Sequence, residues 1–184
     1  MEPITIRKAT IEDLPAVREI CKITCTDPYL LEHLKTLYLL YADYYLNEEQ
    51  GHCFVALAKG KVIGYILSSF DQTLFNRTMK SKYLPVLKAS DPRSYRLEKA
   101  FLFATLFWKS YRAHLHIDIL PAYQHQGIGS RLMENLVAAL RLNHVKRVYL
   151  AVSSSHRNAV AFYRKNHFKT LYHVSGSYVL GRKL

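Results

Sequence analysis

The stretch His116–Met133, "HIDILPAYQHQGIGSRLM", decides which fold the sequence predicts. Its first residues alternate between polar and apolar, which is typical of a β-strand, and its last residues begin an amphipathic helix. Between the two lie Pro121 and two glycines, Gly127 and Gly129. A strand, a glycine-containing loop and a helix in this order are typical of an anion site, because the unpaired N–H groups at a helix start attract phosphate.

The rest of the sequence surrounds this unit with hairpins and helices. A predicted hairpin over residues 52–70 turns at Lys59-Gly60, where glycine can supply the positive φ of a tight turn. The other predicted strands cover residues 4–9, 113–120, 147–153 and a closing hairpin within 169–184, and the predicted helices cover 13–24, 30–49, 128–142 and 156–168. A strand-helix-strand unit among hairpins predicts a single α/β domain of the α+β type over residues 1–184. Its sheet is mixed and mostly antiparallel, with about six or seven strands and helices on both faces.

Two segments leave their role open. Residues 71–110 are longer than most loops and have no regular pattern, and we expect an inserted helical segment that builds or covers a substrate site. Within it, Asp91 and Pro92 predict the start of a helix that runs to Trp108. Residues 30–49 carry four tyrosines at helical spacing, which indicates either a core face or an aromatic wall that faces the substrate.

Composition narrows the partners and the compartment. The formal charge of +12 favours anionic partners such as nucleic acid, a polyphosphate cofactor or an acidic surface, but the basic residues are dispersed, which disfavours nucleic acid. No apolar run predicts a membrane span, and the start "MEPITIRKAT" has no apolar signal segment. Cys21, Cys25 and Cys53 form neither a complete disulfide set nor a metal-ligand pattern. We expect a cytoplasmic monomer or homodimer with reduced thiols and no metal.

The glycine loop fits none of the common nucleotide motifs. Gly127 and Gly129 let the backbone approach a ligand without a Cβ in the way, and Arg131 adds a cation in the first helical turn. A Rossmann fingerprint needs a third glycine where Leu132 stands, and the G-K-[ST] of a P-loop is absent. The loop is therefore either an ordinary strand-to-helix connection or a phosphate site of another class.

Two motifs resemble one known family, the GNAT superfamily of N-acetyltransferases. Gln124-x-x-Gly127-x-Gly129, preceded by "HIDILP", resembles the [RQ]-x-x-G-x-[GA] loop that binds the acetyl-CoA pyrophosphate in that family. "NAVAFYRKNHF" resembles the family's second motif, which it matches at Asn158, Ala161, Phe162, Tyr163 and Phe168. The family's glycine in this motif is His167 here, and we expect Asn166 to take the left-handed conformation in its place.

The resemblance implies an acyltransferase that moves an acetyl group from acetyl-CoA directly to a primary amine in a ternary complex. The backbone of Ile119 and Leu120 would bind the pantetheine arm, and Asn158 would bind its amide or cap the helix. Tyr163 would protonate the departing thiolate or hold it by a hydrogen bond, or would be only a core aromatic. The pyrophosphate would be held by the loop and the first helical turn: Gln124, His125, Gln126, Gly127, Ile128, Gly129, Ser130 and Arg131.

The general base has several candidates. His114, His116 and Asp118 occupy alternate positions of one predicted strand, so their side chains share one face. "AHLHID" is similar to the paired-histidine strand of serotonin N-acetyltransferase, but on alignment of the loop glycines that pair falls on Ala113 and Leu115, one position out of register. Asp118 and His116 therefore stand as equal candidates, beside a water chain with no single base.

A finer resemblance and two rival functions complete the predictions. "HCFVALAKGKVIGYILSSFDQTLF", "LHIDILP" and "YVLGRKL" resemble the acetyltransferase-like domain associated with O-GlcNAcase and its free-standing bacterial relatives. The rivals are a catalytically weak acyl-CoA-binding sensor or scaffold and, less favoured, a nucleic-acid-binding domain. The acceptor stays open among a peptide N-terminus, lysine, an aminoglycoside, a polyamine and a small metabolite.

Overall fold

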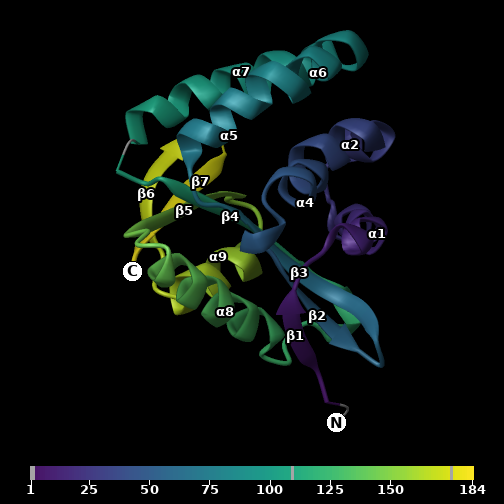
Figure 1. The fold of residues 1–184 in the computed structure, drawn as a ribbon. Helices are drawn as coiled ribbons and strands as arrows, with labels where there is room; N and C mark the ends of the chain where they lie inside the picture. Colours follow the sequence, from purple (N-terminus) through teal and green to yellow (C-terminus); the bar gives the residue numbers. More distant parts are fainter. Residues whose placement is uncertain (1–2, 109, 175) are drawn as a thin grey trace.

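A seven-stranded sheet organises the computed structural model, which describes residues 3–108, 110–174 and 176–184. The strand order is β1-β2-β3-β4-β5-β7-β6, and every neighbouring pair is antiparallel except β4 and β5 (Figure 1). The sequence predicted this mixed, mostly antiparallel sheet, and the structure confirms it. The strands are β1 (Thr5–Lys8), β2 (Phe54–Ala58), β3 (Lys61–Ser69), β4 (Ala113–Ile119), β5 (Arg147–Ser153), β6 (Lys169–Val174) and β7 (Ser177–Lys183).

Helices cover both faces of the sheet, and a separate hydrophobic core lies under each set. On one face pack α8 (Ile128–Leu142) and α9 (Arg157–Lys165). On the other pack α1 (Leu14–Thr24), α2 (Pro28–Glu32), α3 (Leu34–Tyr38), α4 (Tyr44–Glu48), α5 (Gln72–Thr78), α6 (Leu84–Ser90) and α7 (Pro92–Ala104). Among the described residues, no helix is long and apolar enough to cross a membrane.

Local chemistry explains two of the predicted element ends. The turn between β2 and β3 places Lys59 and Gly60 at φ 50° and 73°, the left-handed region that a tight hairpin requires. Before α1, the Thr10 N–H donates to Asp13 Oδ2 over 2.9 Å, and Arg7 pairs with the same carboxylate at 2.7 Å. These contacts satisfy an otherwise free N–H group and fix where the chain enters the first helix.

The single helix predicted over residues 30–49 is wrong. His33 has non-helical angles (φ −121°, ψ 57°), and a π-helical turn over Leu39–Asp43 separates α3 from α4. A π-turn holds an extra residue, so it shifts which side chains face the sheet beyond it. As a result, the tyrosines divide between the two expected roles. Tyr44 is part of the core, and Tyr41 lines a cavity.

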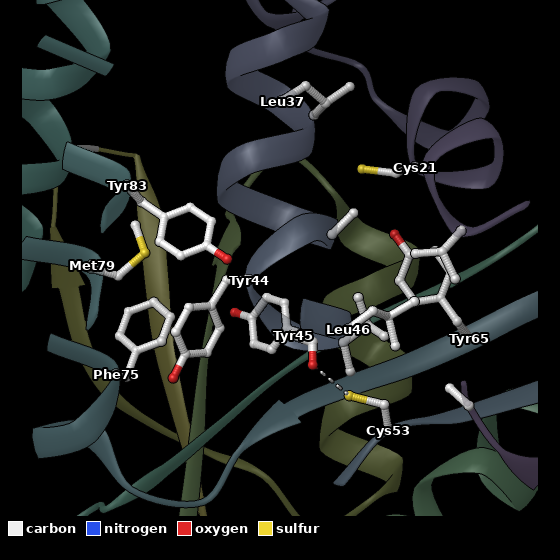
Figure 2. Packing of buried hydrophobic residues seen from close by; sticks show 14 of the residues in the cluster. Cys21, Leu37, Tyr44, Tyr45, Leu46, Cys53, Tyr65, Phe75, Met79 and Tyr83 are labelled. Carbon is white, nitrogen blue, oxygen red and sulfur yellow. Dashed lines mark hydrogen bonds between the residues drawn. The ribbon is translucent and has the colours of Figure 1, made fainter. Parts of the chain in front are cut away.

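Tyr44 is the centre of the core that joins α4 to the segment between β3 and β4 (Figure 2). Its ring is fully buried and meets Phe75 and Tyr83 edge-on, with centroids 4.5 and 5.7 Å away. Met79 fills the space beside these rings. Buried aromatic pairs of this geometry contribute beyond their area, so α4 and the following helices form one packed unit.

The β3–β4 segment (residues 71–108) is helical almost throughout. The predicted helix from Pro92 is confirmed, since α7 starts there and Asp91 Oδ1 accepts from the Ser94 N–H over 3.0 Å. Helices also fill the part before it, since α5, a π-turn and α6 cover residues 72–90, as expected of a helical insertion. Asp71 caps α5, and Pro85 lies in the first turn of α6, where its missing N–H costs no hydrogen bond.

A buried network of hydrogen bonds ties this segment to the sheet. Gln72 Oε1 accepts from His114 Nδ1 and from the Tyr149 hydroxyl, both over 2.8 Å. The Tyr45 hydroxyl donates to His114 Nε2 over 3.1 Å, and Gln72 Nε2 donates to Asn76 over 2.8 Å. Burial lowers the pKa of His114 to about 4, so the ring stays neutral with its proton on Nδ1. His114 is therefore a structural group.

We predict that Gln72→Leu destabilises the fold far more than its neighbour Thr73→Leu, which changes an exposed side chain. The leucine leaves two buried donors, on His114 and Tyr149, without an acceptor, which costs about 2–5 kcal/mol in the free energy of unfolding. Urea denaturation of both variants measures the difference. A Gln72→Leu variant as stable as Thr73→Leu would contradict the network.

Candidate active site

Strands β4 and β5 diverge immediately after they meet. Their pairing consists of Ala113 with Val148 and His114 with Tyr149, although β4 continues to Ile119. On its other edge β4 pairs with β3 along its whole length. A gap therefore opens between β4 and β5, and one edge of β4 lines it.

The hydrogen-bond alternation of β4 decides which groups face the gap. The Leu120 N–H donates to the Ile63 carbonyl over 2.9 Å, so the backbone groups of Leu115, Ile117 and Ile119 point the other way, toward β5. Gln124 Nε2 reaches the Ile119 carbonyl from that side, over 2.9 Å. Such an edge can pair with an extended chain that carries amide groups.

Only one of the two predicted edge residues is free for that pairing. Ile119 presents its N–H to the gap, as expected. Leu120 does not, because its N–H bonds to Ile63 and its carbonyl accepts from the Tyr123 N–H over 2.9 Å. The structure corrects the prediction for Leu120, whose chain has already turned toward the glycine loop.

Gly127 is the N-cap of α8 and has the left-handed angles φ 76°, ψ −1°. A Cβ there would meet nothing within 4 Å, so the backbone conformation requires the glycine and the space does not. The first intrahelical bond at this end runs from the Arg131 N–H to the Gly127 carbonyl, over 3.2 Å. The N–H groups of Ile128, Gly129 and Ser130 therefore point out of the helix start, where the dipole favours an anion.

The sequence suggested that Gly129 makes room for a ligand, but the structure shows that it makes room for neighbouring side chains. A Cβ there would lie 3.0 Å from the Phe162 ring and 3.4 Å from Ile119 Cδ1. The glycine therefore serves the close packing of α8 against α9, and only its N–H is available to a ligand. This contact joins the two motifs, since Phe162 precedes Tyr163 on α9.

The polar side chains around the loop have mixed roles. Arg131 donates to the Ile4 carbonyl over 2.9 Å, so its charge stays near the helix start but one donor is occupied. Gln126 braces the loop through the Ala122 carbonyl at 3.1 Å. His125 is exposed with φ 61° and makes no hydrogen bond within the described part of the chain.

Two predictions for the second motif are wrong in detail. The N-cap of α9 is His156, and Asn158 lies inside the helix, exposed and without a hydrogen bond to any described residue. Asn158 is therefore no cap, which leaves its amide free for a ligand. Asn166 keeps φ −89° and donates to the Phe162 carbonyl over 2.9 Å, while His167 itself takes the left-handed conformation with φ 66°.

Tyr163 lies in the core on the α8–α9 face of the sheet, 7% exposed, between Phe162 and Phe168 at 5.3 and 5.8 Å. Burial raises the pKa of its phenol, and the charge of Asp118 adds to the rise. The phenol therefore keeps its proton at neutral pH. Its hydroxyl has no hydrogen-bond partner within the described residues, so it remains free to donate to a ligand.

His116 and Asp118 share one face of β4 with His114, as predicted. His116 Nε2 lies 2.9 Å from Asp118 Oδ2 as an ion pair, although its N–H is not aligned for a hydrogen bond. The same carboxylate accepts from the Tyr65 hydroxyl over 2.6 Å. Burial lowers the pKa of His116, but Asp118 and Cys21 together outweigh it and raise the pKa to about 10. A protonated His116 has no lone pair to accept a proton, and Asp118 is already engaged twice.

A cavity of about 340 Å³ lies on this face, at the point where the strands diverge. Its floor includes Leu115 and Leu150, the first residues beyond the last β4–β5 pair. Tyr41, Tyr45 and Phe75 form one wall of the cavity. Helix α7 forms another wall with Leu97, Glu98 and Phe101. The sequence did not single out Glu98, because a lone glutamate on an amphipathic helix has the pattern of a solvated face.

Comparisons with known proteins agree with this geometry. The model of the acetyltransferase (GNAT) family matches residues 15–168. An N-alpha-acetyltransferase of Saccharolobus solfataricus is 25% identical over 182 residues, which cover 96% of this chain and 87% of that protein. The crystal structure of SsHAT is 26% identical, with a TM-score of 0.84 over 98% of both chains. The PaiA N-acetyltransferase of Thermoplasma acidophilum in complex with coenzyme A has a TM-score of 0.67 over 99% of both chains at 18% identity, which shows the fold alone.

We predict that Gly127→Val abolishes acetyl-CoA binding while Gly60→Val does not. Both glycines have positive φ with open space around them, so each variant carries a similar backbone strain. Only Gly127 sets the direction of the free N–H groups of α8. Calorimetric titration with acetyl-CoA compares the folded variants, and an unchanged affinity for Gly127→Val would remove the loop from the site.

Proposed function

Because the chain belongs to the acetyltransferase (GNAT) family and is an acyltransferase with acetyl-CoA as its cosubstrate, we propose that it acetylates a primary amine by direct transfer in a ternary complex. The observation that carries the proposal is the gap between β4 and β5. One side of the gap leads to the free N–H groups of α8, and the other leads to the cavity under α7. Two substrates can therefore meet there without sharing a binding site.

We assign the cosubstrate to the side of the gap that α8 and α9 cover. The N–H groups of Ile128, Gly129 and Ser130 would hold the pyrophosphate, and the edge of β4 at Ile117 and Ile119 would pair with the pantetheine amides. The free amide of Asn158 would add a further hydrogen bond. This arrangement directs the acetyl group toward Leu115 and Leu150, where the strands separate.

The acceptor we propose is the α-amine of a peptide. The relative from Saccharolobus solfataricus, an N-alpha-acetyltransferase, supports this class because the similarity extends over nearly the whole chain. The cavity, of about 340 Å³, has room for the first residues of an extended peptide. Residues of the β3–β4 segment line it, which supports the expectation that the segment contributes to acceptor choice.

The sequence keeps the glycine loop, Asn158 and Tyr163, which favours a working enzyme over an acyl-CoA-binding sensor. The resemblance to the O-GlcNAcase acetyltransferase-like domain and the cytoplasmic location remain predictions.

Release of CoA from acetyl-CoA, measured against a panel of peptides, lysine derivatives and polyamines, tests the proposed function. Acetyl-CoA binding without turnover of any amine would favour the sensor.

We expect Tyr163→Phe to lower kcat by roughly 10²- to 10⁴-fold with little change in acetyl-CoA affinity, because the variant removes the proton that the departing thiolate needs and keeps the ring. Since chemistry would limit the rate, kcat/KM should fall with kcat. Tyr172→Phe, a half-exposed position stacked on Trp108, is the matched control. Equal kcat values for the two variants, both folded by thermal melting, would make Tyr163 a core aromatic only.

A further inference from the structure

The proposed amine transfer lacks a group that can take a proton from the acceptor. A primary ammonium must lose a proton before its nitrogen can attack. His114 is neutral but occupied at both nitrogens, by Gln72 and Tyr45. His116 is protonated, and Asp118 holds His116 and Tyr65. The groups on β4 are therefore engaged in structural contacts.

Glu98 is an acidic side chain in the cavity wall that pairs with none of the described residues. It lies near the middle of α7, partly buried, and it forms no hydrogen bond or ion pair within the described chain. By contrast, Asp27, the other carboxylate of the wall, accepts from the Tyr29 N–H over 2.9 Å and caps α2. A partly buried carboxylate without a partner is costly for the fold, and it has no structural reason here.

The groups that face Glu98 across the cavity do not neutralise it. The charged or chargeable ones are Asp27, Arg93, His114 and His116. Arg93 lies over the Tyr29 ring at 4.2 Å, and His116 is paired with Asp118. The remaining titratable groups are the phenols of Tyr29, Tyr41, Tyr45 and Tyr149.

The electrostatics agree with a carboxylate that faces this interior. Burial alone raises the pKa of Glu98 to about 7. Burial also raises the pKa values of Tyr41, Tyr45 and Tyr149, and the charge of Glu98 adds to each rise, so the carboxylate acts on phenols from three different elements. A base with a pKa near the working pH accepts and releases protons most efficiently.

We propose that Glu98 is the general base of the acetyl transfer and that the acceptor enters the cavity as a cationic amine, an inference that rests on the proposed function. The Glu98 carboxylate takes one proton from the ammonium. The freed nitrogen lone pair forms the C–N bond with the acetyl carbon, and the C–S bond breaks with its electrons on sulfur. The thiolate takes its proton from the Tyr163 phenol, and the second amine proton, lost as the amide forms, restores that phenol through solvent. Glu98 releases its proton to water, so one proton is set free in each turnover. Aromatic rings of the wall stabilise the cation before it loses its proton.

The proposal has a definite pH dependence. A general base works only when deprotonated, so kcat/KM should fall as the pH falls through about 7, the pKa of Glu98 in the free protein. Glu98→Gln keeps the shape of the side chain and removes this ionisation. The variant should lose the limb of the pH profile, which is the fall in rate below about pH 7. It should retain about 10⁻² to 10⁻⁴ of the wild-type kcat.

The experiment measures kcat and KM from pH 5.5 to 9 for wild type, Glu98→Gln, Glu98→Asp and Glu134→Gln, with the best amine of the panel. Glu134 is an exposed glutamate of α8 and controls for the chemical change itself. We expect a loss of kcat and of the limb in Glu98→Gln, partial recovery in Glu98→Asp, and wild-type behaviour in Glu134→Gln. Acetyl-CoA affinity should not change in any variant, and no variant should melt below wild type, since Glu98→Gln removes a costly carboxylate.

Three results would overturn the assignment. These are an unchanged kcat in Glu98→Gln, a rise in KM alone with the limb intact, or a joint loss of folding and acetyl-CoA affinity. The first two would return the role of base to a water chain, and the third would make Glu98 structural. If wild type itself turns over no amine, the proposed function fails and not the assignment alone, so the two failures are distinguishable.

Discussion

Hydrogen bonding between β4 and β5 stops after His114 and Tyr149, and the rest of the candidate site depends on that ending. Both residues of the last pair bond to the same oxygen, Oε1 of Gln72. The network therefore lies at the vertex of the two strands and fixes the point from which they diverge.

The sequence predicted the sheet well because strands and hairpins depend on local patterns. Alternation located β4, the apolar run located β5, and the Lys59-Gly60 turn located the hairpin between β2 and β3. The helix over residues 30–49 was predicted without its breaks, because a π-turn is set by tertiary packing around Tyr44 and Tyr45 and leaves no periodic signal. Both glycines of the loop were found, but the packing of Gly129 on Phe162 depends on a residue far away in the sequence.

The sequence predicted those parts of the candidate site that depend on local motifs, and missed those that depend on tertiary contacts. Motif positions such as Gly127 and Tyr163 were recognisable from their spacing. The state of His116 was not, because its pKa depends on the balance between burial and the charge of Asp118. Glu98 was missed because nothing in its neighbourhood on α7 distinguishes a cavity-facing carboxylate from a solvated one. Glu98 reaches the point where β4 and β5 separate because the β3–β4 segment folds over the sheet.

The loop and the cavity lie on opposite faces of the sheet, and the gap between β4 and β5 lies between them. In the proposed complex, a molecule on one face does not obstruct the path to the other face. Sterics therefore impose no obligatory order of substrate entry, and either product can depart first. Any preferred kinetic order would have to come from how one occupant reshapes the gap, for example across the bond from Thr26 to His156 that links α1–α2 with the start of α9.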